Sequence, residues 1–506
     1  MGRLEDPDST GRQEHVVKNP ATGKTLARTV IMANAEDAQT TIYDAHQNFR
    51  SGVWSKKPAV ERAQVLSALA HVLSIRMEEF VYLESMQTGR PIREMKAQLG
   101  RLPEWLEYFA AALRTHQGFI APTQGKLLNY VQRIPLGVVA QVTPFNHPLL
   151  IAIKKIAPAL AAGNSVIVKP SEAAPLSVLQ FAEMSLIAGV PPGVLNVLPG
   201  YGKTIVPELA SHPLVRKVDI TAGTKTGRAI GKLVGSNLAE YTAELGGKAP
   251  IVVFKDADIQ SAVSGAAFAC FIASGQTCVS GTRLIIQDEI YDEFMEQFLK
   301  KVESITARMG NRIIERKDHD GYSISQGQLE RIEKLVQRPG IGNILTGGRR
   351  LTGTSPLDGH DFSKGSFFPP TVISDVQLED DLWREEVFGP VVVVKRFYDE
   401  AEGIELANAC KYGLGAGIWT SDLSRAHRVA AEIESGLVWV NTHHRNDPSS
   451  PWGGMKQSGI GRENGLEALD AYTQSKSTIV NIASAEETRT TIDWFADDDV
   501  SEKRYG

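Results

Sequence analysis

The first part of the chain alternates apolar and polar residues at helical spacing. Two amphipathic stretches, residues 37–50 and 59–87, predict helices, and in the second a row of leucines beginning at Leu66 falls on one face. Residues 127–142 change to the alternation that is typical of strands. The chain is therefore predicted to pass from helices to strands before residue 143.

From residue 163 onward, short apolar runs alternate with amphipathic segments. The strand-like runs are residues 165–170, 193–200, 215–221 and 251–254, and the helix-like segments between them are residues 177–189, 204–212 and 226–235. The same alternation returns later, with strand-like runs at residues 282–287, 390–397 and 435–441 and a helix-like segment at 292–305. Alternating strands and helices imply parallel sheets covered on both faces. The sequence predicts two α/β lobes that meet near residues 244–248.

Composition excludes several classes of protein. The chain has 506 residues, enough for about three domains. Its formal net charge of −5 gives no basic field for nucleic acid or a membrane surface. No apolar run approaches the ~18 residues that span a bilayer, and the N-terminus lacks an apolar signal segment. Three cysteines in so long a chain favour a reducing compartment, so we expect a cytoplasmic protein.

The sequence signals for a dinucleotide differ in strength. Gly200 and Gly202 follow a predicted strand, but Ile205 stands where a GxGxxG fingerprint has its third glycine, and a plain strand-to-helix turn explains them equally well. Lys169 and Glu172, in "VKPSE", follow another strand, where open α/β sheets bind ligands. A carboxylate there can accept both ribose hydroxyls. The alternative is a solvated ion pair at a helix start, capped by the serine at position 171.

Cys278 lies in "FIASGQTCVSG", residues 271–281, among small and flexible neighbours. That setting admits a substrate and places backbone amides close by, which favours the reactive thiolate. The alternative is a small core residue, which is our interpretation of Cys270 and Cys410. Glu244 in "ELGGK" could deprotonate a water, and Asn146 in "TPFNHP" could donate to a developing oxyanion.

Taken together, these three residues and several further motifs resemble the aldehyde dehydrogenase superfamily. The motifs appear in the family's order from about residue 19 to residue 481, and they are "NPATGK", "KPSE", "GVPPGVLNVLPG", "REEVFGPV" and "PWGGMKQSGIGRE". The resemblance implies an α/β fold with a Rossmann-like coenzyme domain, an α/β catalytic domain and a small β oligomerisation element. The implied ranges are 1–115 and 136–246 for the coenzyme domain, 247–462 for the catalytic domain, 116–135 and 463–483 for the oligomerisation element, and 484–506 for an acidic tail. That tail, with "DWFADDD", is expected either to be disordered or to pack on a neighbour.

The resemblance also implies a mechanism. Cys278 attacks the aldehyde, Asn146 and the Cys278 backbone N–H hold the oxyanion, and hydride passes to a nicotinamide. Glu244 activates the water that releases a carboxylic acid, with Lys155 and Glu463 relaying protons.

The coenzyme contacts implied by the family are Lys169, Ser171, Glu172, Gly202, Gly223, Thr224, Leu245, Glu386 and Phe388. Because a carboxylate beside the ribose repels a 2′-phosphate, NAD is predicted over NADP. The chain departs from the family at residues 220–223, where "ITAG" replaces the usual "FTGS" and removes a serine hydroxyl.

The predicted substrate residues are His147, Lys154, Arg445 and Trp452. Lys154 stands where many relatives have an aromatic residue, so the tunnel is expected to be polar and basic and to favour an anionic aldehyde of the semialdehyde type. The alternative places Lys154 and Arg445 in solvent or against acids at an oligomer interface.

Other functions stay open at this point. A CoA-acylating relative would lack Glu244, and a catalytically silent binding protein would have lost a reacting residue. A phosphorylated substrate is compatible with the basic loop that carries His443, His444 and Arg445. We expect a small-molecule aldehyde as substrate, a homodimer or homotetramer, and no metal, nucleic-acid or membrane partner.

Overall fold

The computed structural model describes residues 12–310, 325–492 and 494–495 of the chain. Its first large sheet has the strand order β19-β9-β8-β5-β6-β7, and its strands are parallel except at the β19 edge. The strands are β19 (Gly459–Ile460), β9 (Glu240–Glu244), β8 (Val215–Thr221), β5 (Val138–Val142), β6 (Ser165–Lys169) and β7 (Leu195–Val197). The crossover pattern predicted from the sequence is confirmed. One strand departs from the predicted domain ranges. β19 lies within residues 247–462, the range predicted for the catalytic domain, yet it pairs with β9 in the sheet of the coenzyme domain.

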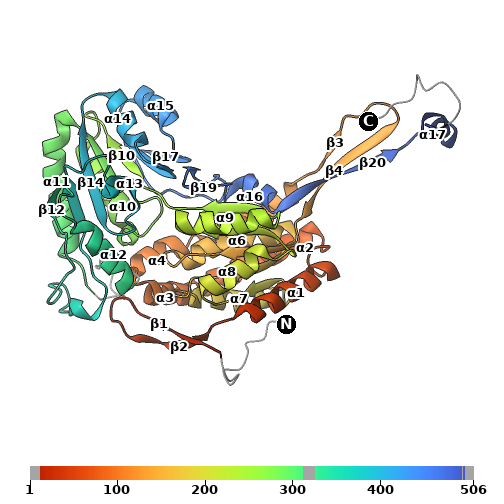
Figure 1. Cartoon of the computed structure of the whole chain (residues 1–506), viewed down its shortest axis with the longest axis horizontal. Helices are drawn as coiled ribbons and strands as arrows, with labels where there is room; N and C mark the ends of the chain where they lie inside the picture. Colours follow the sequence, from red (N-terminus) through yellow and green to blue (C-terminus); the bar gives the residue numbers. More distant parts are fainter. Residues whose placement is uncertain (1–11, 311–324, 493, 496–506) are drawn as a thin grey trace.

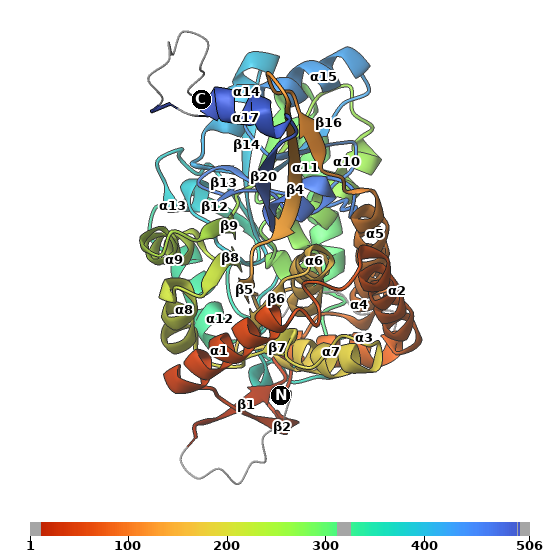
Figure 2. The same ribbon diagram turned by 90° about the vertical axis from the view of Figure 1, so that its right-hand side faces the viewer.

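Helices cover both faces of this sheet (Figure 2). One face carries α1 (Ala35–Ser51), α8 (Gly202–Ser211) and α9 (Thr224–Ser236). The other carries α2 (Ala59–Ile75), α3 (Met77–Thr88), α4 (Ile92–Leu99), α5 (Leu102–Thr115), α6 (Pro148–Ala162), α7 (Leu176–Ile187) and α16 (Gly465–Ala471). Alternate residues of β6 point to opposite faces, so Val166 and Val168 join one core and Ile167 joins the other.

Local sequence explains where these helices begin and end. Asn34 and Asp37 form a reciprocal capping box at the start of α1, and Gly52 ends the helix in the left-handed region at φ 82°. The single helix predicted over residues 59–87 is wrong in one respect. It is broken at Arg76 (φ −95°, ψ 12°) into α2 and α3, and the buried leucine row beginning at Leu66 belongs to α2.

The second large sheet has the order β12-β13-β14-β11-β10-β16-β17, parallel except for β12. Its strands are β12 (Asn343–Thr346), β13 (Thr371–Ser374), β14 (Val391–Phe397), β11 (Arg283–Gln287), β10 (Pro250–Val253), β16 (Gly415–Trp419) and β17 (Leu437–Val440). On one face pack α10 (Ile259–Phe271) and α11 (Asp288–Thr306). On the other pack α12 (Gln326–Val336), α13 (Asp381–Arg384), α14 (Glu400–Asn408) and α15 (Leu423–Glu432).

A third sheet of three antiparallel strands projects away from both lobes (Figure 1). Its strands are β3 (Phe119–Ala121), β4 (Leu127–Pro135) and β20 (Thr473–Asn481), and they lie where the oligomerisation element is predicted. Beyond β20 comes α17 (Ala485–Ile492), so the predicted acidic tail begins with a helix, and Glu487 of that helix pairs with Lys126. Most of "DWFADDD" lies outside the described residues.

Two short antiparallel pairs complete the fold. They are β1 (Glu14–Lys18) with β2 (Thr25–Ile31), and β15 (Tyr412–Gly413) with β18 (Met455–Lys456). Across the part of the chain that the structure describes, no helix is both long and apolar enough to cross a bilayer.

Candidate active site

Three loops meet between the two large sheets. Asn146 follows β5, Glu244 is the last residue of β9, and Cys278 follows α10 and a short 3₁₀ turn. The side-chain amide of Asn146 donates from Nδ2 to the Gln276 carbonyl at 2.7 Å. A Cβ at Gly247 would lie 2.0 Å from the Cys278 carbonyl oxygen, so only glycine permits this approach. The three predicted reacting residues therefore belong to one packed set of loops.

The backbone before Cys278 is strained. Ala273, Ser274 and Gly275 all have left-handed φ values, of 52°, 54° and 66°. For the first two residues this conformation costs free energy, and such strain clusters at functional sites. A Cβ at Gly275 would lie 2.2 Å from the Gly389 carbonyl oxygen. The close approach at Gly275 thus places the cysteine loop against the segment that carries the predicted coenzyme residues Glu386 and Phe388.

The ionisation of Cys278 differs from the expectation. Burial raises the pKa of its thiol to about 12, the Glu386 and Glu244 carboxylates raise it too, and Lys154 opposes them. The thiol packs against a cluster that contains Trp452. Burial and the two carboxylates therefore favour the thiol, whereas the small, amide-rich surroundings predict a thiolate.

Glu244 is a buried carboxyl, and in the described part of the chain its two oxygens have no hydrogen-bond partner. Burial raises its pKa well above the usual range, and Glu463 raises it further, whereas Lys154 and Lys155 oppose the shift. Because its acidity is weakened, this carboxyl holds a proton more tightly than an exposed glutamate does, a property that suits a general acid–base group.

Behind Glu244 lies a buried charge cluster. Lys155 pairs with Asp219 and Glu463, whose carboxylates raise its pKa even though burial opposes the charge. Tyr472 donates from its hydroxyl to Asp219 at 2.7 Å. The structure thus brings together the predicted relay residues Lys155 and Glu463, and it adds Asp219 and Tyr472, which no sequence motif singles out.

Lys154 lies in neither predicted place. Its side chain is 1% exposed, its Nζ is 2.7 Å from Glu463 Oε2, and it sits 4.6 Å from the ring centroid of Trp452. It is therefore neither at a solvated surface nor at an oligomer interface. Its ammonium group forms a buried ion pair with Glu463, so it is not an unpaired positive charge in a substrate tunnel. Arg445 is exposed, and only its carbonyl is engaged here, by Trp439 at 3.0 Å.

Lys169 and Glu172 follow β6 as expected. The Lys169 ammonium pairs with Glu172 Oε2 at 2.9 Å, and although burial opposes the charge, this lysine lowers the pKa of Glu172. Ser171 does not cap a helix, because α7 begins only at Leu176. Its hydroxyl instead accepts from the Ala173 N–H at 3.3 Å.

The other predicted coenzyme residues lie at the same sheet edge. Gly202 begins α8, and Gly223 precedes α9 with open space where a Cβ would stand. Leu245 fills the space beside Gly227. Thr224 donates from its hydroxyl to the Gln457 carbonyl at 3.3 Å.

Glu386 and Phe388 reach the site from the second lobe. Glu386 accepts the Gly247 N–H at 3.0 Å, and burial raises its pKa to about 7. Phe388 has φ 55° and its ring meets that of Phe145 edge-on at 5.7 Å. Helix α12 fixes this segment, a role that sequence reasoning missed. Its Gln328 and Arg331 side chains donate to backbone carbonyls of residues 386–388.

A family model for the aldehyde dehydrogenase family matches residues 7–478. Phenylacetaldehyde dehydrogenase of Pseudomonas fluorescens is 38% identical over 475 residues, with 92% of each chain covered. The chain belongs to the aldehyde dehydrogenase family.

Solved structures agree with this assignment. PnpE from Pseudomonas sp. WBC-3 is 39% identical with a TM-score of 0.88, covering 93% of this chain and 95% of that one. Betaine aldehyde dehydrogenase from Staphylococcus aureus, solved in complex with NAD⁺, is 35% identical with a TM-score of 0.90, covering 95% and 94%. The aldehyde dehydrogenase fold expected from the sequence is therefore confirmed.

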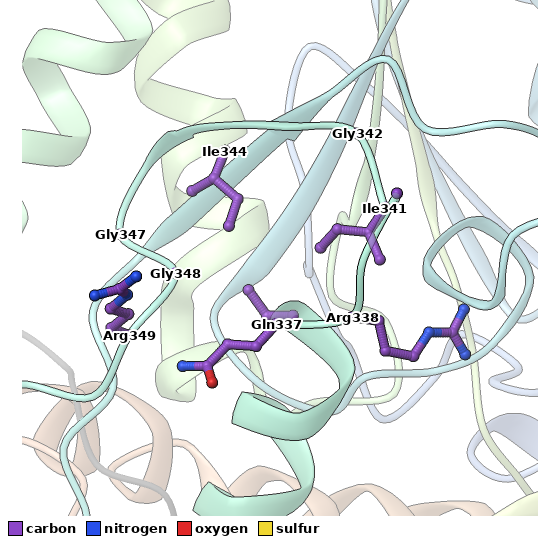
Figure 3. A pocket seen from close by; sticks show the side chains of 10 residues that line it. Gln337, Arg338, Ile341, Gly342, Ile344, Gly347, Gly348 and Arg349 are labelled. Carbon is purple, nitrogen blue, oxygen red and sulfur yellow. The ribbon is translucent and has the colours of Figure 1, made fainter.

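One open pocket of this aldehyde dehydrogenase lies away from the reacting residues. It measures about 740 Å³ and is bordered by the end of α12 and by β12, with Arg338, Ile341 and Arg349 among its lining residues (Figure 3). No predicted site residue lines it. Within residues 12–310, 325–492 and 494–495, no three His, Cys, Asp or Glu side chains gather as metal ligands would.

Proposed function

We propose that the protein oxidises an aldehyde to its carboxylic acid with NAD. The Cys278 sulfur forms a bond to the aldehyde carbon, and Asn146 with the Cys278 N–H stabilises the resulting oxyanion. Bound NAD supplies the hydride acceptor that no side chain provides. Loss of hydride leaves a thioester on Cys278. Glu244 takes a proton from water, whose oxygen bonds to the acyl carbon as the S–C bond breaks.

The observation that carries this proposal is the state of Glu244. It is buried, its pKa is raised, both of its oxygens lack a partner, and its loop contacts Cys278 directly. A merely structural carboxyl would be paired. Because the Cys278 thiol also has a raised pKa, a proton acceptor is needed before attack, and Glu244 is placed to serve. Lys155 and Glu463 then pass protons onward.

The test follows NADH by absorbance with a panel of aliphatic, aromatic, amino and acidic aldehydes. Cys278→Ala should abolish NADH formation. Glu244→Gln should lower the rate of NADH formation about 10²–10⁴-fold, because both the attack by Cys278 and the hydrolysis of the thioester lose their proton acceptor. Cys410→Ala is the matched control and should behave as wild type.

Two outcomes would contradict the proposal. Absence of NADH with every aldehyde, while the coenzyme still binds, would favour a catalytically silent binding protein. Formation of acyl-CoA in preference to acid when CoA is added would favour a CoA-acylating enzyme.

NAD is proposed over NADP because of Glu172. Its carboxylate lies beside Lys169 at the end of β6, where it can accept the ribose hydroxyls and would repel a 2′-phosphate. The residues fit a dinucleotide, since Gly223 leaves open space at the start of α9. We expect kcat/KM with NAD to exceed that with NADP by at least about tenfold, and equal values would contradict this preference.

The substrate is proposed to be a polar aldehyde, and the proposal of an anionic semialdehyde rests on Arg445, because Lys154 already pairs with Glu463. The projecting sheet is proposed to join subunits into a homodimer or homotetramer. Its strands expose Phe119, Ile120, Ile479 and Val480, and an apolar patch of this kind marks an interaction surface.

A further inference from the structure

His147 directly follows Asn146 at the start of α6, and its imidazole is 4% exposed. Its Nδ1 lies 2.6 Å from a terminal nitrogen of Arg90. A guanidinium only donates hydrogen bonds, so Nδ1 must accept and carries no proton. The Gln98 Oε1 atom lies farther from Nδ1, at 3.1 Å, and it already accepts from Arg90. The hydrogen of the neutral ring is therefore on Nε2.

Arg90 is itself held rigidly between α3 and α4. Two of its nitrogens donate to Glu94 at 3.2 and 3.0 Å, and the third donates to Gln98 at 2.9 Å as well as to His147. Burial and the Arg90 charge lower the pKa of His147 well below its ordinary value. The ring is consequently held as one neutral tautomer.

The Nε2 atom of this ring is buried and has no hydrogen-bond partner among the residues that the structure describes. Leaving such a donor unpaired is unfavourable, and native proteins rarely do so without a reason. The ring stands 6.2 Å from that of His444, whose backbone is strained at φ 54°. His444 in turn stands 6.2 Å from Trp452, which packs in the cluster that contains Cys278. The His147 ring is thus connected through His444 and Trp452 to the cluster against which Cys278 packs.

The charges around this donor are already matched. Arg90 pairs with Glu94 and Lys154 pairs with Glu463. Burial lowers the pKa of His444 to about 3, so that ring is neutral at pH 7. Burying a carboxylate without a free counter-charge is unfavourable, whereas an uncharged oxygen needs only a donor.

We propose that His147 binds the substrate by donating from Nε2 to an uncharged acceptor oxygen in the tail of the aldehyde, and that Arg90 is the positioning residue that keeps the ring in this donor form. The inference rests on the proposed aldehyde oxidation. Under this inference the tail of the substrate carries a neutral ether, hydroxyl or carbonyl oxygen in place of the anionic group of a semialdehyde.

The test uses the full enzyme with NAD and three matched pairs of aldehydes. Each pair exchanges one methylene for an ether oxygen: butanal and methoxyacetaldehyde, pentanal and 3-methoxypropanal, hexanal and 4-methoxybutanal. Wild type should favour the ether in at least one pair by about tenfold in kcat/KM. His147→Phe should remove that preference. His147→Gln, which keeps a side-chain N–H, should retain part of it.

The readout is the ratio of the kcat/KM values for the two aldehydes of a pair, because a structural defect would lower both values alike. The buried-pair variant Arg90→Met/Glu94→Leu should reduce the preference by freeing the tautomer. The control variant Arg76→Met/Glu79→Leu, which removes another arginine–glutamate pair, should retain it. NADH formation with equal rates in all three pairs, or a preference that survives in His147→Phe, would overturn the inference while leaving the proposed function intact. No NADH from any aldehyde would overturn both.

A second measurement needs no substrate. In enzyme labelled with ¹⁵N-histidine, the resonances that disappear in His147→Phe should show a pyridine-type Nδ1 and a pyrrole-type Nε2. The reverse assignment would overturn the role of Arg90.

Discussion

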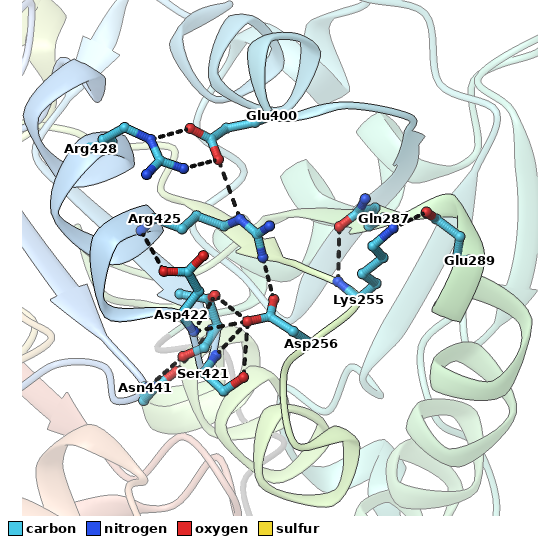
Figure 4. A network of polar contacts seen from close by, with 11 residues as sticks. Lys255, Asp256, Gln287, Glu289, Glu400, Ser421, Asp422, Arg425, Arg428 and Asn441 are labelled. Atoms are coloured by element: carbon cyan, nitrogen blue, oxygen red, sulfur yellow. Dashed lines mark hydrogen bonds and ion pairs between the residues drawn. The ribbon is translucent and has the colours of Figure 1, made fainter.

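Two glutamates of this molecule are each shared by two basic side chains, one in the interior and one at the surface. Glu463 lies between Lys154 and Lys155, and its side chain is 3% exposed. Glu400 lies between Arg425 and Arg428, and its side chain is 30% exposed (Figure 4). The arrangement of charges is alike, so the comparison isolates what burial does to it.

The difference lies in how far each cluster acts. Burial opposes the Glu463 charge, yet the two lysines lower its pKa to about 2. The same lysines and Glu463 also shift the pKa of Glu244. The surface cluster consists of Glu400, Arg425 and Arg428, and Arg425 also donates to Asp256, which follows β10. Asp256 in turn accepts hydrogen bonds from Thr420 and Ser421 in the loop after β16. In the interior a low dielectric carries charge effects to the reacting groups, whereas water confines them at the surface.

Removing the Glu463 carboxylate, which Lys154 and Lys155 share, should have the largest effect on folding stability. Glu463→Gln leaves Lys155 paired with Asp219 but takes from Lys154 its ion-pair partner, and should cost about 3–5 kcal/mol of folding stability. Glu400→Gln, the matched surface change, should cost at most about 1 kcal/mol. Thermal unfolding of both variants gives the comparison, and equal losses of stability would show that burial does not separate the two clusters.

Removing one lysine should shift activity more than stability. Lys154→Met takes away a charge that lowers the pKa of Glu244, so this pKa should rise and the base should become ionised only at higher pH. The acid limb of the kcat profile should therefore move to higher pH. Arg428→Met at the surface is the control and should leave the profile in place. A limb that stays fixed, or moves to lower pH, in Lys154→Met would contradict the coupling.

The comparison also shows what the sequence could and could not predict. Cys278, Glu244 and Asn146 were predicted because several short motifs occur together in the order of one family, although each motif alone is ordinary. The crossover sheets follow likewise from the alternation of apolar runs. The partner of Lys154 was not predictable, because it and its neighbour Lys155 meet a glutamate some 308 residues away. The contact between Arg90 and His147 is equally invisible, since it depends on how α3, α4 and α6 pack. Tertiary contacts, not local pattern, decided both cases.

The smallest expected effect concerns Asp256 in the surface cluster. Burial opposes its charge, but hydrogen bonds from Thr420 and Ser421, with Arg425, lower its pKa to about 2 from the usual 3.8. Because the folded pKa is the lower one, the stabilisation is present above about pH 4 and is lost as pH falls toward 2. The side chain is partly exposed, so solvent screening reduces the contribution to about 1 kcal/mol.

Asp256→Asn should therefore lower Tm by about 1–2 °C at pH 7, and the gap to wild type should narrow as pH falls below 4. Asp292→Asn, at a more exposed ion pair with Arg396, is the control and should change Tm less. If the difference in Tm between wild type and Asp256→Asn grew as the pH fell, the folded-state pKa of Asp256 would have to be raised and not lowered. A gap as large as that of Glu463→Gln would remove the contrast between the two clusters, since water would then screen the surface charges no better than the protein interior does.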